Sequence, residues 1–122
     1  MSTDWSDDIV LSELSDEPAL SEELSAIIQR VVALREPGTH CPHVVLNFGN
    51  VGYVTSSNLA QLLRLRGLLG ERSRLLKICS VADNVWSVFM MTGLDKVFRF
   101  APDPMTALAG IQLQSDENNP NG

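Results

Sequence analysis

The segment from residue 43 to residue 69, HVVLNFGNVGYVTSSNLAQLLRLRGLL, constrains the fold more than any other part of the chain. It starts with an apolar run at residues 44–48, passes through a loop with glycines at 49 and 52, and continues with leucines at helical spacing. A short, continuous apolar run is typical of a strand that is covered on both faces. A strand that leads into an amphipathic helix belongs to a βαβ unit, so this segment predicts an α/β domain.

Further strands are expected on both sides of this segment. Residues 8–14 have the mixed polarity of an edge strand, and residues 75–79 form a second short apolar run. Residues 97–100 alternate between apolar and cationic side chains, which is typical of a last strand. Strands separated by helices are joined by crossovers in a parallel sheet. We therefore expect one α/β domain whose mostly parallel central sheet has about four to five strands and about four helices.

The helix before the central strand is expected to begin at Glu17-Pro18, because proline is tolerated in the first helical turn. The proline-glycine pair at 37–38 ends this helix, and Gly70 is expected to end the helix that follows the central strand. The first helix has one apolar stripe, formed by Leu20, Leu24, Ile27, Val31 and Leu34.

A third helix is predicted over residues 84–92, with Asp83 as its N-cap and Gly93 as its end. A fourth helix is expected after Asp103-Pro104. The large apolar residues of the third helix are expected in the core: Trp86, Phe89 and Met90.

Length and charge limit the kinds of protein that this chain can be. Its 122 residues are enough for one core, which we place at residues 8–113, between a flexible N-terminus (1–7) and a disordered polar tail (114–122). A net charge of −6 argues against a nucleic-acid-binding protein, which normally has a basic face. The sequence has no apolar run near the ~20 residues that span a membrane, and its acidic start does not match a signal peptide. We therefore expect a cytoplasmic protein.

Two cysteines, Cys41 and Cys79, precede one expected strand and end another. In parallel strands these positions lie near opposite edges of the sheet, roughly 15 Å apart, whereas a disulfide requires Cα atoms within about 7 Å. We expect two free thiols, as in a reducing compartment.

Three hydroxyl residues, Thr55, Ser56 and Ser57, lie where the central loop meets its helix. Serine, threonine and asparagine are favoured as N-caps, so capping alone explains the cluster. A helix start also has unpaired N–H groups and the positive end of the helix dipole, which favour a phosphate group. The pattern leaves both interpretations open.

Two segments carry a resemblance to a known family. VVLNFGNVGYVTSSNLAQLLRLRGLL resembles the central segment of STAS domains, the fold of bacterial anti-sigma factor antagonists, in which a strand and loop lead to an Asp-Ser-Ser-Gly-Leu element. SRLLKICSVADNVWSVFMMTGLDKVFRF is similar to the family's next strand, helix and closing strand. The resemblance covers residues 43–109, with both motifs in the same order and at the same spacing as in the family.

The resemblance implies a phosphorylation switch. Unphosphorylated antagonists capture an anti-sigma factor, typically a serine kinase; phosphorylation of the second serine abolishes capture, and a serine phosphatase restores it. That serine corresponds to Ser57, with Ser56 as second choice. The resemblance also implies a partner-binding surface: Gly49, Asn50, Gly52, Thr55, Ser56, Ser57, Asn58, Gln61 and Arg64.

The chain departs from the family pattern at Thr55, where the family has an aspartate, and at Asn58, where it has a glycine. These departures favour an alternative function, a non-phosphorylated STAS scaffold or a transport-accessory or assembly module. A small nucleotide-sensing domain is a third alternative, suggested only by the helix start.

Other residue patterns do not indicate catalysis. The sequence has no G-x-S-x-G, Walker A, G-x-G-x-x-G or H-E-x-x-H motif, so we expect neither an enzyme nor a cofactor. His40-Cys41-Pro42-His43 has no obvious fourth metal ligand and is interpreted as an ordinary loop. The arginines at 64, 66, 72 and 74 form either a solvated helix face or an interaction patch.

Overall fold

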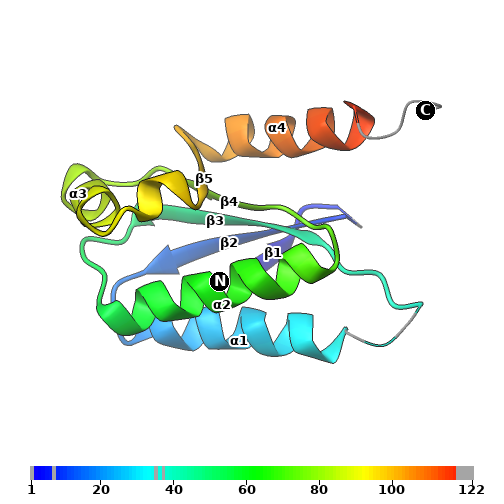
Figure 1. Cartoon of the computed structure of the whole chain (residues 1–122), viewed down its shortest axis with the longest axis horizontal. Coiled ribbons are helices and arrows are strands. Elements are labelled where there is room, and N and C mark those ends of the chain that lie inside the picture. The colour runs from blue at the N-terminus through cyan, green and yellow to red at the C-terminus, as the bar shows by residue number, and fades with distance from the viewer. Residues whose placement is uncertain (1, 7, 35, 37, 118–122) are drawn as a thin grey trace.

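A computed structural model describes residues 2–6, 8–34, 36 and 38–117 (Figure 1). One sheet has the strand order β1-β2-β3-β4-β5, in which β2 to β5 are parallel and β1 is antiparallel to β2. The strands are β1 (Ser2–Asp4), β2 (Ile9–Ser15), β3 (His43–Asn50), β4 (Leu76–Cys79) and β5 (Arg99–Ala101). The expected α/β fold with a mostly parallel sheet is confirmed.

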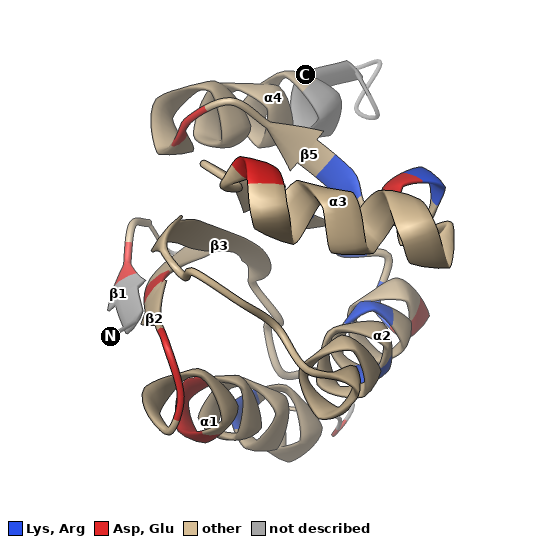
Figure 2. Ribbon diagram, turned by 90° about the vertical axis from the view of Figure 1, so that its left-hand side faces the viewer, with Lys and Arg blue, Asp and Glu red and all other residues tan. Residues whose placement is uncertain are grey.

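Helices cover both faces of this sheet. They are α1 (Ala19–Ala33), α2 (Ser56–Glu71), α3 (Asp83–Thr92), a 3₁₀ turn η1 (Leu94–Lys96) and α4 (Pro104–Glu117). Helices α1 and α2 lie side by side against one face, and α4 lies against the other (Figures 1 and 2). None of the helices in the described part of the chain is long and apolar enough to cross a membrane.

Side chains on the two faces of β3 belong to two separate apolar clusters. Leu46 and Phe48 join the larger cluster with residues of α1, α2 and α3, whereas Val45 joins the smaller cluster under α4. Successive side chains of a strand point to opposite faces, so a strand between two helical layers must be apolar at nearly every position. This arrangement explains the continuous apolar run in the sequence.

The N-terminal strand β1 differs from the sequence interpretation, which left residues 1–7 outside the domain. Asp4 pairs with Val10 across the antiparallel ladder, and its carboxylate lies 2.9 Å from the Arg30 guanidinium of α1. A short polar strand has no apolar alternation, so periodicity does not reveal it. At the other end, α4 passes the expected boundary at residue 113 and reaches Glu117, and residues 118–122 of the expected tail lie outside the described residues.

Several helix ends also differ from expectation. Gly70 lies inside α2, which continues to Glu71, and Ala82 rather than Asp83 is the N-cap of α3. Gly93 ends α3 as expected, with a positive φ of 77° that a glycine adopts without strain.

The last strand also begins later than expected, at Arg99 rather than at residue 97. The turn η1 lies directly before it, and the N–H of Val97 donates to the Leu94 carbonyl instead of to the sheet.

The apolar residues of α3 are only partly in the core. Phe89 is buried and Trp86 is half-buried with its ring edge-on to Phe100, at a centroid distance of 4.9 Å. Met90, in contrast, is 50% exposed, so its expected core position is wrong. The helix presents Met90 away from the sheet.

Cys41 and Cys79 are free and fully buried, which confirms the expectation of two thiols. Burial raises the pKa of both, so they remain protonated at neutral pH. A protonated, buried thiol is a poor nucleophile and a poor metal ligand.

Candidate functional site

The loop between β3 and α2 lies at the edge of the sheet where the parallel strands end. Its centre, Gly52, is held from two sides. The Gly52 N–H donates to Asp16 Oδ1 at 2.6 Å, and the amide of Asn84 donates to the Gly52 carbonyl. Asp16 follows β2 and Asn84 opens α3, so the two neighbouring connections fix this loop. Crevices at this edge are the usual binding sites of open α/β sheets.

The first turn of α2 is closed by a reciprocal pair of hydrogen bonds. Thr55, the N-cap, accepts from the Asn58 N–H with Oγ1 at 3.2 Å, and its own N–H donates to Asn58 Oδ1 at 2.9 Å. This is a capping box in which asparagine replaces the usual glutamate or glutamine. Capping of α2 is therefore assigned to Thr55, and the two serines are not needed for it.

Asn58 faces inward and is fully buried. Its Nδ2 donates to Ser21 Oγ of α1 at 3.3 Å, which fastens the start of α2 to the neighbouring helix. Gln61 is half-buried and extends this link, since its Nε2 donates to the Ser21 carbonyl at 3.1 Å and to Ser25 Oγ at 3.0 Å. Asn58 is therefore turned away from the expected docking surface, whereas Gln61 stays partly exposed.

Ser57 occupies the second position of α2 and is exposed, as is Ser56 before it. Among the described residues, no side-chain or backbone group bonds to either hydroxyl. The structure thus separates the two interpretations of the cluster by residue: Thr55 caps, and Ser57 presents a free hydroxyl. Its position in the first helical turn favours a negative charge there.

Four other residues of the expected docking surface also lie at the surface. Gly49, Asn50, Gly52 and Arg64 are all exposed.

Sequence reasoning missed Tyr53, a loop residue that is 50% exposed, and it also missed the supporting pair Asp16 and Asn84. The sequence position of Asp16 and Asn84 could have indicated this role. Both polar residues come after a strand, at the edge of the sheet where the β3–α2 loop lies.

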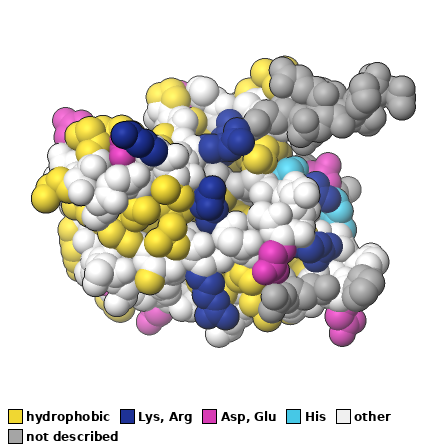
Figure 3. Space-filling view, in the orientation of Figure 1, with side chains coloured by type: hydrophobic (Ala, Val, Ile, Leu, Met, Phe, Trp, Pro, Cys, Tyr) yellow, Lys and Arg dark blue, Asp and Glu magenta, His cyan; other side chains and the backbone are white. Residues whose placement is uncertain are grey.

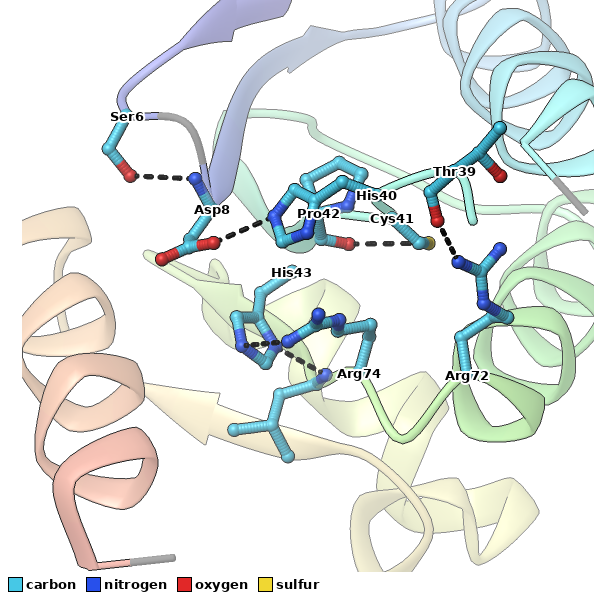
Figure 4. Close-up of polar contacts among 10 residues, drawn as sticks. Ser6, Asp8, Thr39, His40, Cys41, Pro42, His43, Arg72 and Arg74 are labelled. Carbon is cyan, nitrogen blue, oxygen red and sulfur yellow. Dashed lines mark hydrogen bonds and ion pairs between the residues drawn. The ribbon is translucent and has the colours of Figure 1, made fainter. Parts of the chain in front are cut away.

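The histidine-cysteine segment before β3 does not form a metal centre. His40 Nε2 lies 2.7 Å from Asp8 Oδ1, while the His43 ring points away toward Arg74 (Figure 4). Across the described residues, no group of three or more His, Cys, Asp or Glu side chains could hold a metal ion.

Comparisons with known proteins agree with this architecture. Residues 10–107 match the STAS domain family. No curated protein sequence matches significantly.

Among solved structures, the chain is similar to an anti-sigma-factor antagonist (STAS) domain protein from Planctomyces limnophilus, with 17% identity, a TM-score of 0.73, and coverage of 92% of this chain and 97% of that one. It is also similar to SpoIIAA from Bacillus in its phosphorylated form (16% identity, TM-score 0.62, 84% and 91% covered). A third is a sulfate transporter family protein from Wolinella succinogenes (14% identity, TM-score 0.65, 89% and 87% covered). At these identities the likeness shows the fold.

Proposed function

The chain belongs to the STAS domain family, and from that premise we propose that it is an anti-sigma factor antagonist controlled by phosphorylation of Ser57. In this proposal the unphosphorylated protein captures an anti-sigma factor that is itself a serine kinase. That kinase then phosphorylates Ser57, and a serine phosphatase reverses the step. The observation that supports it most is the exposed, unbonded hydroxyl of Ser57 beside a fixed loop. The protein acts by binding, without a cofactor, in the cytoplasm, and without nucleic acid or membrane.

The inward orientation of Asn58 supports this assignment. The family has a glycine at this position, and a larger side chain pointing outward would hinder a kinase. Here the Asn58 amide is buried against Ser21 and Thr55, so it leaves the approach to Ser57 open. The asparagine also supplies the capping box that a glycine cannot supply.

A phosphate at Ser57 would act locally. It would add a charge of about −1.5 to −2, partly stabilised by the start of α2. The capping box uses only Thr55 and Asn58, so the helix does not need the Ser57 hydroxyl to stay folded. The new charge would instead act on the partner at the docking surface. We define the docking surface as the exposed residues Gly49, Asn50, Gly52, Tyr53, Thr55, Ser56, Ser57 and Arg64.

The direct test is to incubate the protein with its cognate anti-sigma kinase and ATP, and to locate the phosphate by mass spectrometry. We expect one phosphate on wild type and none on Ser57→Ala. Ser73→Ala, a matched substitution at the exposed far end of α2, should be phosphorylated like wild type. Phosphorylation that persists in Ser57→Ala would contradict the assignment.

A fixed scaffold, such as a transport-accessory or assembly module, is the second candidate. The similarity to a sulfate transporter family protein favours it, as does the capping box, which gives Thr55 and Asn58 a structural role. This candidate predicts capture of a partner by the same surface in both wild type and Ser57→Asp. The antagonist predicts capture by wild type alone.

A further inference from the structure

A second candidate site lies far from Ser57, at the edge of the sheet where β4 and β5 begin. A cavity of about 270 Å³ opens there between the last turns of α2 and the start of both strands. Three arginines line it, Arg66 from α2, Arg74 before β4 and Arg99 from β5, together with Gly67, Gly70 and Phe98. We call it the arginine cavity. Gly70 lies thirteen positions after Ser57, roughly 20 Å along α2, so the two sites are distinct.

The charge at this cavity is not neutralised by the protein. None of its three guanidinium groups has an ion-pair partner among the carboxylates of the described residues. Figure 3 shows several separate Lys and Arg patches on one side of the molecule, although the whole chain has a net charge of −6. A positive cluster of this kind, kept in an acidic protein, attracts an anion.

Among the described residues, Arg74 has donor groups that no acceptor satisfies. Its Nε is buried and has no hydrogen-bond partner. Arg74 Nη1 lies 3.4 Å from His43 Nε2 (Figure 4), but His43 Nε2 cannot accept a hydrogen bond from Arg74. The reason is that His43 Nδ1 already accepts the N–H of Leu75 at 2.9 Å, which places the imidazole proton on Nε2. Two donors therefore face each other, and a buried donor without an acceptor is energetically unfavourable.

The other walls of the cavity favour a small, oxygen-rich ligand. The Arg66 Nε–H donates to the Val97 carbonyl at 3.1 Å, which orients its guanidinium beside the opening. Gly67 and Gly70 leave open space, since no atom lies within 4 Å of where their Cβ atoms would be. At about 270 Å³ the cavity is smaller than the ~300–1,000 Å³ of pockets that enclose a drug-sized ligand. It fits one anionic group rather than a whole cofactor.

We propose that the arginine cavity binds the phosphate group of a small phosphorylated molecule. Guanidinium groups form paired, charge-assisted hydrogen bonds with phosphate oxygens, and a doubly charged phosphate matches three arginines better than a single carboxylate does. Bound phosphate oxygens would accept from the Arg74 guanidinium, which is the group left without an acceptor. The ligand is free phosphate or a small phosphomonoester, and this proposal is independent of phosphorylation at Ser57.

The test is a titration of the full chain with inorganic phosphate at constant ionic strength, followed by calorimetry and by the imidazole resonances of His43. We expect saturable binding with a Kd of about 1 mM or tighter, and movement of the His43 signals. Arg74→Gln and Arg99→Gln should each weaken binding by about tenfold or more. Arg30→Gln, the same change on the exposed face of α1 outside the cavity, should leave Kd within about twofold.

Gly70→Leu is a second variant that keeps every charge and improves helix propensity, so it tests the cavity without weakening the fold. It should abolish phosphate binding by filling the space. Phenyl phosphate, compared with inorganic phosphate, identifies the source: tighter binding indicates a phosphomonoester, and weaker binding indicates the free ion. The proposal is overturned if no saturable binding occurs, or if Arg30→Gln weakens binding as much as Arg99→Gln does.

Discussion

Thr55 and Asn58 determine what Ser57 is free to do. The side chain of each residue accepts a hydrogen bond from the backbone N–H of the other, and the Asn58 amide also donates to Ser21 of α1. The cap of α2 is complete without either serine. In the sequence, Thr55, Ser56 and Ser57 form one cluster of hydroxyl residues. The N-cap could not be assigned to one of the three from the sequence, because threonine and serine are both favoured as N-caps. Only the side-chain directions separate the cap from the free hydroxyl.

Replacement of Asn58 tests this division of roles. Asn58→Ala removes half of the capping box and leaves the Thr55 N–H without its acceptor, so we expect a loss of about 1–3 kcal/mol in the free energy of unfolding. Ser57→Ala, which removes one exposed hydroxyl group from the same turn, should change the free energy of unfolding by less than about 0.5 kcal/mol. Urea unfolding of both variants measures this. Equal stability of the two would show that the box contributes little.

His43 gives the protein a pH dependence whose sign follows from its surroundings. Burial and the neighbouring Arg74 lower the pKa of His43 from its ordinary 6.5. The unfolded chain then binds more protons than the folded chain below about pH 6.5, so stability falls as the pH drops below this value. His43→Asn keeps an acceptor for the Leu75 N–H and cannot titrate. In phosphate-free buffer its unfolding midpoint should fall less on acidification than that of wild type, and parallel pH profiles would contradict the assignment.

At the scale of elements, the loop between β3 and α2 is fixed in position by hydrogen bonds from the segments beside it. Asp16 lies in the connection after β2, Asn84 lies in the first turn of α3, and both bond to the backbone of Gly52. The approach is close, since a Cβ at Gly52 would lie 3.4 Å from Asp16 Oδ2. A rigid loop presents the docking surface with little ordering cost on binding.

Removal of the Asp16 carboxylate should loosen this loop without unfolding the domain. Asp16 is exposed, so Asp16→Ala should cost less than about 1 kcal/mol in stability. Amide exchange at Gly52 should become faster, because its N–H loses its acceptor. Hydrogen exchange followed by NMR measures the change, with Asp95→Ala in η1 as the control. Unchanged exchange at Gly52 in Asp16→Ala would show that the loop is held by other contacts.

The whole molecule shows which features a sequence reveals. Apolar periodicity predicted the parallel strands and the four helices, since each element buries a face whose spacing is visible in the chain. It missed β1, because Ser2–Asp4 has no apolar alternation. The family resemblance placed Asn58 on the docking surface, and only the folded structure shows that its amide turns inward. The arginine cavity was visible only in part, as the arginines at 64, 66, 72 and 74. Arg99 comes from a strand distant in sequence, and only the fold brings it to Arg66 and Arg74.

The central claim is that the charge state of residue 57 controls capture by an intact domain. Calorimetric titration of the anti-sigma factor with wild type and with Ser57→Asp tests it directly, with Ser73→Asp at the far end of α2 as the matched control and circular dichroism to confirm folding. We predict that Ser57→Asp stays folded and loses at least about tenfold in affinity, a change of about 1.4 kcal/mol, while Ser73→Asp binds like wild type. Equal affinity of wild type and a folded Ser57→Asp would contradict the account.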